Sequence, residues 1–218
     1  QWTGLNTGLQ HQTGVEYQAG VVHSFDDVVR LDATGFLSRN KNEIFVDPTL
    51  SGGVGDNSNY PHTERIGLEL GSHWDILRSF PMPGLKTWDL SGSLTLMRPT
   101  FNGGDFGSQD IPFVPRQQAG LGTELMLKSG WGLSLDGRYT GAKYAINDVR
   151  NEKPLVKPNI LVDTKLKYHW ASAEAYVGVN NLFGKKYNEY VVFGQSSGNI
   201  DYYPAPERNY VVGMKCRF

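Results

Sequence analysis

The sequence contains very little cysteine and histidine. Its single cysteine, Cys216, cannot form an internal disulfide, and none of its five histidines belongs to a His-x-x-x-His pair. No Cys/His group has the spacing of a zinc site, so we expect no metal centre. Neither sign of charge is in excess, since 21 basic residues face 22 acidic ones. This balance excludes the basic surface that nucleic-acid binding requires.

Long hydrophobic runs are also absent. The mean hydropathy is −0.40, and no window of about 18 residues is free of charge, which excludes a membrane-spanning helix. A transmembrane barrel stays possible, because barrel strands expose apolar side chains to lipid only at every second position. Residues 1–4 lack the basic start and apolar core of a signal peptide. We therefore expect an exported protein that has been processed, or a fragment.

Motifs for covalent chemistry are weak. The glycine-rich segment 51–55 is followed by no Gly-Lys-Ser/Thr, so it does not predict a phosphate loop. Asp105 and Asp110 lack the spacing of a calcium loop. A Ser/His/Asp triad cannot be read from sequence, because its members meet only in space. We expect no catalytic residues, no cofactor and no enzyme activity, while a membrane-barrel hydrolase remains an open alternative.

Alternation of apolar and polar residues runs through almost the whole chain. Leu133 and Leu135 share one face of a segment whose other face carries Asp136 and Arg138. This two-residue period is typical of strands and predicts an all-β protein. The predicted strands are 14–25, 28–46, 62–76, 86–98, 114–129, 131–145, 157–170, 172–193 and 207–218.

The connections between these strands alternate in length. Tight turns are expected at 24–27, 128–130 and 170–172, with a medium turn at 77–85. Long polar linkers are expected at 47–61, 99–113, 146–156 and 194–206. Short turns at one rim and long loops at the other indicate an antiparallel transmembrane β-barrel, with periplasmic turns and extracellular loops. The last strand ends on the aromatic Phe218, which is typical of the closing strand of such a barrel.

The polar faces favour a barrel over a soluble β-sandwich. A sandwich must bury its inward faces in a core, whereas here those faces are charged in strand after strand. We expect them to line a solvated interior and to pair across strands. The charged residues assigned to this interior are Arg30, Asp32, Arg65, Glu69, Glu124, Asp136, Arg138, Asp163, Lys165 and Lys167.

Several motifs resemble one family. Residues 177–187 (Val-Gly-Val-Asn-Asn-Leu-Phe-Gly-Lys-Lys-Tyr) are similar to the penultimate-strand signature of the TonB-dependent outer-membrane receptors, of the siderophore and ferric-citrate type. Residues 203–210 resemble their last loop and strand, and 111–116 a common strand entry. Residues 63–70 fit a mid-barrel strand. The chain departs from the usual pattern at Glu207 and Cys216.

The resemblance carries implications for the whole protein. Such receptors have about 22 strands and a plugged lumen, so about nine strands imply that residues 1–218 are the carboxy-terminal portion of the barrel, with the plug domain and the amino-terminal strands absent. The implied location is the outer membrane of a Gram-negative bacterium. Implied partners are outer-membrane lipid, a ferric siderophore-like ligand and the barrel-assembly machinery, which would recognise Gly213 and Phe218. The TonB energy-coupling complex would act through the missing part.

Ligand contacts are expected among aromatic and cationic residues of the long loops. Ferric siderophore and ferric citrate complexes are often anionic, which suits arginine beside aromatic rings. The candidates are Tyr60, His62, Phe101, Phe106, Arg150, Lys153, Tyr202, Tyr203 and Arg208. Two alternatives stay open: a small self-contained barrel acting as a pore or hydrolase, and a soluble β-rich binding module.

Overall fold

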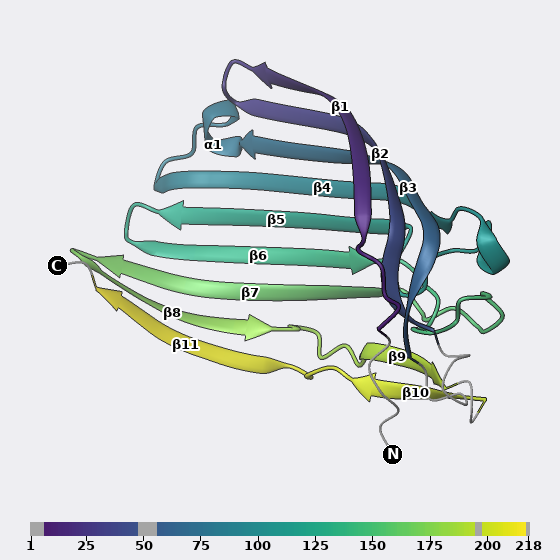
Figure 1. The fold of residues 1–218 in the computed structure, drawn as a ribbon. Helices are drawn as coiled ribbons and strands as arrows, with labels where there is room; N and C mark the ends of the chain where they lie inside the picture. Colours follow the sequence, from purple (N-terminus) through teal and green to yellow (C-terminus); the bar gives the residue numbers. More distant parts are fainter. Residues whose placement is uncertain (1–6, 48–55, 195–197, 217–218) are drawn as a thin grey trace.

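Nearly all of the protein is antiparallel β-structure. The computed structural model describes residues 7–47, 56–194 and 198–216 (Figure 1). The elements in chain order are β1 (Thr13–Phe25), β2 (Val29–Asp47), β3 (Asp56–Asp75), α1 (Ile76–Ser79), β4 (Leu85–Phe101), η2 (Gly104–Phe106), β5 (Gln117–Leu127), β6 (Trp131–Thr140), β7 (Asn159–Trp170), β8 (Ala173–Asn180), β9 (Asn188–Gly194), β10 (Asn199–Pro204) and β11 (Asn209–Cys216). The all-β prediction is confirmed.

The strands form one large curved sheet and one small sheet. Nine strands pair in the order β1-β2-β3-β4-β5-β6-β7-β8-β11, and β9 pairs with β10 separately. Short turns lie at one end of the large sheet and long connections at the other, as expected (Figure 1). Within the described strands β1 and β11 are edges that do not pair with each other. Within the described residues the large sheet is therefore open and does not close on itself as a small self-contained barrel would.

One face of the sheet is apolar and uncovered. A row of apolar side chains crosses the sheet through the register pairs Leu125–Leu133, Leu133–Leu166 and Leu166–Val177. Leu133 and Leu166 are each 47% exposed, whereas a sandwich would bury them under a second sheet. The alternation therefore marks an uncovered apolar face of the kind that a transmembrane barrel presents to lipid, and the soluble module is not supported.

Aromatic side chains gather at the short-turn end of this apolar face. The ring centroids of Trp131 and Tyr168 are 4.8 Å apart, and those of Tyr168 and Trp170 are 5.9 Å apart. The indole nitrogen of Trp74 donates to Ser79 Oγ at 2.6 Å. Amphipathic rings of this kind anchor a protein at a membrane interface, so they mark one border of the apolar band.

The opposite face carries the predicted charges. Arg138 Nη2 lies 2.6 Å from Asp163 Oδ2 on the next strand, and Lys167 pairs diagonally with Glu124. His169 Nε2 lies 2.9 Å from Glu174 Oε2. Because these groups remain partly exposed, each pair contributes little to stability, at most about 1 kcal/mol. The polar face is therefore a solvated wall cross-linked by charges, as the alternation predicted.

Large side chains on the polar face lie flat over glycines of the neighbouring strand. A Cβ added to Gly67 would lie 2.6 Å from Cζ of Phe36, and one added to Gly213 would lie 2.4 Å from Cζ of Tyr176. Gly213 and Tyr176 are register partners on β11 and β8. Because glycine has no side chain, a ring from the adjacent strand can lie against the sheet at each of these positions.

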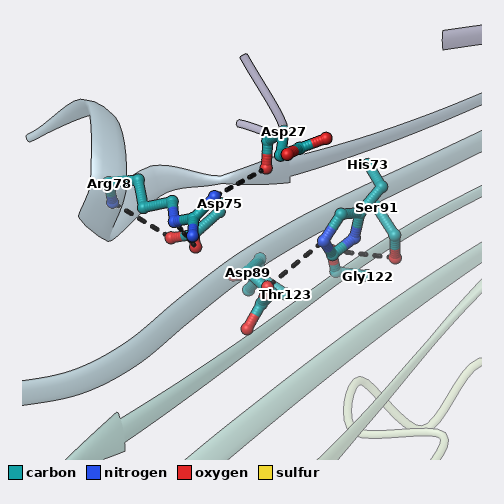
Figure 2. A network of polar contacts seen from close by, with 8 residues as sticks. All are labelled: Asp27, His73, Asp75, Arg78, Asp89, Ser91, Gly122 and Thr123. Atoms are coloured by element: carbon teal, nitrogen blue, oxygen red, sulfur yellow. Dashed lines mark hydrogen bonds and ion pairs between the residues drawn. The ribbon is translucent and has the colours of Figure 1, made fainter. Parts of the chain in front are cut away.

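Polar contacts tie the short-turn end together (Figure 2). Asp75 caps α1 by accepting from the Arg78 amide at 3.0 Å, and Arg78 Nη1 donates to the carbonyl of Asp27 at 3.3 Å (Figure 2). His73 Nε2 lies 3.3 Å from Asp89 Oδ1 (Figure 2). The medium turn expected at 77–85 thus begins with a single helical turn that reaches across to the β1–β2 turn.

Two strand predictions were wrong. Residues 199–204, expected within the linker 194–206, form strand β10 and pair with β9. Residues 172–193 form two strands of different sheets, β8 and β9, instead of one. The break begins at Asn181, whose φ of 53° lies in the left-handed region. Its side chain closes a turn by accepting from the Lys185 amide and donating to the Lys185 carbonyl, both at 2.8 Å. Asparagine tolerates this conformation and mimics a backbone turn, and the two-residue alternation of the sequence does not reveal it.

Gly130 gives a test of turn geometry. Gly130 and Gly84 both have positive φ, 95° and 87°, but only at Gly130 would a Cβ meet backbone, 2.4 Å from the His169 carbonyl oxygen. We expect Gly130→Ala to lower the free energy of unfolding by roughly 2–4 kcal/mol, and Gly84→Ala by about 1 kcal/mol. Urea unfolding of both variants measures the difference, and equal losses would contradict the register of this turn.

Candidate ligand-binding surface

The long connections form a packed core beyond the sheet. Tyr60 and Phe101 are 4% and 2% exposed, and Ile111 and Val149 are buried with them. The ring centroids of Tyr60 and Phe101 are 4.0 Å apart. These residues come from β3, β4 and the two loops 102–116 and 141–158. The loops are therefore held by a hydrophobic core of their own, which we call the loop core.

Phe106 and Arg150 lie at the border of the loop core. Phe106, on η2, is half-buried, and its ring centroid lies 5.8 Å from that of Tyr60. Arg150 is exposed, and its guanidinium carbon lies 5.8 Å from the Phe106 ring centroid. This distance suits a cation–π contact. The pair therefore presents an aromatic surface and a positive charge at one place.

A polar clamp joins the two loops. Arg116 donates two hydrogen bonds to the Asp110 carboxylate, both at 2.7 Å. The Asn151 side chain accepts from the Asp110 amide at 2.6 Å and donates to the Asp110 carbonyl at 3.1 Å. The hydrogen bonds that Arg116 donates to the Asp110 carboxylate raise the pKa of Arg116. The clamp fixes loop 102–116 against loop 141–158 without any strand pairing.

Lys153 is positioned by a buried carboxylate. Asp148 is 2% exposed and accepts from the amides of Glu152 and Lys153 at 3.0 and 3.1 Å. The Lys153 ammonium then lies 4.3 Å from the ring centroid of Phe193 on β9. Its charge is therefore held above an aromatic ring of the small sheet.

The β9–β10 hairpin is tied to the same loops. The Ile146 amide donates to the Val191 carbonyl, and the Phe193 amide donates to the Ile146 carbonyl, both at 2.8 Å. Tyr202 and Tyr203 on β10 remain 61% and 53% exposed. The hairpin thus presents aromatic side chains to solvent from a backbone that is fixed to its neighbours.

Glu43 supports this end of the sheet. It lies on β2 opposite Tyr60 of β3. Tyr60 is fourteen positions along β3 from the interfacial Trp74, so Glu43 lies beyond the apolar band. Arg65 Nη2 donates to it at 2.7 Å. Burial alone would raise the pKa of Glu43. Hydrogen bonds from Arg65 and Thr63 and the charge of Arg65 lower it by more, so the pKa is below its usual value. The carboxylate therefore stays charged here.

The structure brings some of the predicted ligand contacts together. Tyr60, Phe101, Phe106 and Arg150 form one group, although Tyr60 and Phe101 are buried and serve its packing. The remaining candidates, which lie at separate places around the same rim, are His62, Lys153, Tyr202, Tyr203 and Arg208. Ligand contact stays a prediction for all nine residues.

The residues assigned to barrel assembly are placed in part. Gly213 lies on β11 beneath the Tyr176 ring, and Phe218 lies outside the described residues. The roles of Asp148 and Asn151 could not be predicted from the sequence, because their partners are backbone groups of other loop residues. Asparagine and aspartate in loops usually act this way, and the sequence cannot tell which backbone they reach.

The hollow within the loop core is small. It has about 160 Å³ and is lined by Glu43, Phe45, Tyr60, Ile111 and Val149, with further loop residues. Ligand pockets usually have about 300–1,000 Å³. This hollow is therefore too small for such a ligand, while Phe106, Arg150 and the hairpin tyrosines lie outside it.

Within residues 7–47, 56–194 and 198–216 no group of three or more His, Cys, Asp or Glu side chains could hold a metal ion. No helix in the same ranges is long and apolar enough to cross a membrane.

Comparison with known proteins identifies similar barrels. A family model described as "TonB dependent receptor-like, beta-barrel" matches residues 2–182. The ferric-catecholate import receptor Fiu from K12 E. coli is 21% identical over 98% of this chain and 29% of its own, with a TM-score of 0.69. The ferric yersiniabactin uptake receptor FyuA from Yersinia pestis is 22% identical over 93% of this chain and 29% of its own, with a TM-score of 0.70. The copper transporter OprC is 18% identical over 96% of this chain and 32% of its own, with a TM-score of 0.72. The chain thus spans about a third of these proteins.

Proposed function

Since this chain belongs to the TonB-dependent receptor β-barrel family, we propose that it is part of an outer-membrane receptor that takes up a ferric siderophore or a similar iron complex. The observation that carries this proposal is the Phe106–Arg150 pair beside the exposed hairpin tyrosines. Aromatic rings suit the flat organic chelators of such complexes, and arginine suits their anionic oxygens. The location follows the family, in the outer membrane of a Gram-negative bacterium.

The described strands account for only part of such a receptor. Nine strands in one open sheet, against about 22 in a plugged transporter barrel, support the proposal that residues 1–218 are the carboxy-terminal portion of a longer barrel. The plug domain and the earlier strands would belong to the rest of the protein. Coupling to the TonB complex would act through that part, so this segment alone would bind lipid and ligand but would not transport.

Uptake is proposed to involve binding and movement without covalent chemistry. The loops would recognise the iron complex, and energy-coupled movement of the plug would release it inward. Barrel assembly would use Gly213 together with Phe218. No residue is assigned a catalytic role.

The cargo can be tested with the full-length receptor in cells that lack other iron receptors. Radiolabelled ferric catecholate, ferric citrate and copper are offered separately, and energy-dependent accumulation is measured. Accumulation of a ferric complex supports the proposal. Accumulation of copper alone would reject the ferric cargo while leaving the family assignment in place.

Arg150 is the side chain to substitute. We expect Arg150→Gln to weaken binding of an anionic ferric complex by about 10-fold, the equivalent of one charge-assisted hydrogen bond of about 1.4 kcal/mol. Titration of the purified receptor measures this change. Arg30→Gln, an exposed arginine at the short-turn end, is the matched control and should leave affinity unchanged. Equal affinities for both variants and the unsubstituted receptor would remove Arg150 from the binding surface.

A further inference from the structure

A second hollow at the long-loop end is lined by lysines. It has about 390 Å³ and lies between residues 154–159, residues 185–188 and the β9–β10 hairpin. Four of its lining residues are Lys143, Lys157, Lys185 and Lys186, and none of the lining residues is acidic. The chain as a whole has a net charge of −1. Four cations around one hollow therefore depart sharply from the average, and we call this site the lysine pocket.

Most of this charge is not neutralised by the protein. Lys186 Nζ lies 3.6 Å from Glu207 Oε1, and both side chains are largely exposed. Lys157 and Lys185 form no ion pair with any carboxylate in the described part of the chain. Glu189 and Asp201 belong to the same hairpin but do not line the pocket. At least two positive charges thus remain available to a ligand.

The backbone around the pocket is fixed. The Asn181 side chain holds both the amide and the carbonyl of Lys185 at 2.8 Å. Lys143 and Val156 exchange backbone hydrogen bonds of 3.3 and 2.8 Å, and the Lys143 ammonium lies 3.4 Å from the ring centroid of Phe113. Burial lowers the pKa of Lys143, an effect that a bound anion would oppose. The backbone that carries Lys143 and Lys185 is therefore held in place before any ligand binds.

The pocket lies just beyond the apolar face. On the apolar face, the pair of β6 and β7 residues closest to the long loops is Tyr139 and Ile160, and Ile160 is 61% exposed. Lys157 precedes Ile160 by three residues, and Leu155, which also lines the pocket, is 49% exposed. In a bilayer this position corresponds to the level of the lipid headgroups on the long-loop side.

We propose that the lysine pocket binds phosphate groups, and its level in the membrane favours those of a phosphorylated lipid headgroup. Compact ammonium groups act as point charges toward phosphate, and Asn159, Tyr187 and Asn188 also line the pocket. Basic pockets at a membrane surface attract anionic headgroups at about 1 kcal/mol per lysine. This site rests on the proposed outer-membrane location and is independent of the ferric cargo.

Lipid binding to the purified full-length receptor tests the site. The detergent-solubilised receptor is titrated with diphosphorylated lipid A, with its dephosphorylated form and with inorganic pyrophosphate, and bound molecules are counted by native mass spectrometry. We expect Lys157→Gln/Lys185→Gln to weaken binding of diphosphorylated lipid A by roughly 30-fold. The control variant Lys86→Gln/Lys128→Gln removes the same charge at the short-turn end and should weaken it less than 2-fold. The conservative variant Lys157→Arg/Lys185→Arg should retain most binding.

Each outcome decides the proposal. Lysine-dependent binding of the phosphorylated lipid, with weak binding of pyrophosphate, supports a headgroup site. Lysine-dependent binding of pyrophosphate without lipid supports a phosphate site supplied by a soluble ligand. Binding that is equal for both glutamine variants, or equal for the two forms of the lipid, overturns the proposal. None of these outcomes alters the ferric uptake measurement, so the two proposals can fail separately.

Discussion

Leu166→Arg should lower the free energy of unfolding of the membrane-inserted receptor by about 2–4 kcal/mol. Leu166 lies within the twelve residues of β7 and is paired with Leu133 and Val177 on the apolar face. A guanidinium placed there would lie near the middle of the bilayer, where its hydration is lost. Urea unfolding of the receptor refolded in lipid vesicles measures this cost.

The next residue along β7 provides the control. Lys167 lies on the polar face, where it pairs with Glu124. Lys167→Gln removes this partly exposed ion pair and should cost no more than about 1 kcal/mol. A strand shifted by one residue would exchange the two faces. Similar costs at positions 166 and 167 would therefore refute the assigned faces of the sheet.

Arg116→Met should produce the second large effect, confined to the loops. The Asp110 side chain is only 9% exposed, and Arg116 supplies both of its side-chain hydrogen bonds at 2.7 Å. Removing one partner of a buried pair usually costs about 3–5 kcal/mol. Because the Arg116 side chain is itself 58% exposed, we expect about 2–3 kcal/mol here. Amide hydrogen exchange at Ile111 should accelerate roughly 30- to 150-fold.

A double substitution distinguishes two effects of Arg116→Met: leaving the Asp110 carboxylate unpaired, and removing the packing of the Arg116 side chain. In Asp110→Asn/Arg116→Met the buried charge is gone, so exchange at Ile111 should return at least halfway to its original rate. Arg30→Met removes an exposed arginine at the other end of the sheet and should leave this exchange unchanged. If the double variant exchanges as fast as Arg116→Met, an unpaired carboxylate is not the cause.

The sheet could be predicted from sequence because its two faces meet different surroundings. Leu133, Leu166 and Asp136 repeat a two-residue period that lipid on one side and water on the other impose on every strand. The same period could not show where a strand leaves the sheet. Residues 172–193 keep their alternation although Asn181 turns the chain out of the large sheet, because that turn depends on a side chain bonding to nearby backbone.

The binding surface was predictable only as a type of chemistry. Aromatic and cationic residues of the long connections do lie at one end, but the sequence could not separate buried from exposed members. Tyr60 and Phe101 are buried because β3 and β4 extend to 20 and 17 residues and carry them into the loop core. The lysine pocket was also missed, since Lys143 and Lys185 are distant in sequence and meet only through the fold.

The backbone tie between Ile146 and the β9–β10 hairpin has a consequence for affinity. Ordering a loop when a ligand arrives commonly costs about 0.5–1.5 kcal/mol for each immobilised side chain. Here the hairpin and loop 141–158 already share two backbone hydrogen bonds of 2.8 Å, so the backbone entropy of this surface is lost when the protein folds and not when a ligand binds. A preorganised surface of this kind can retain a scarce solute at low concentration with few contacts, and it should discriminate among solutes by their shape.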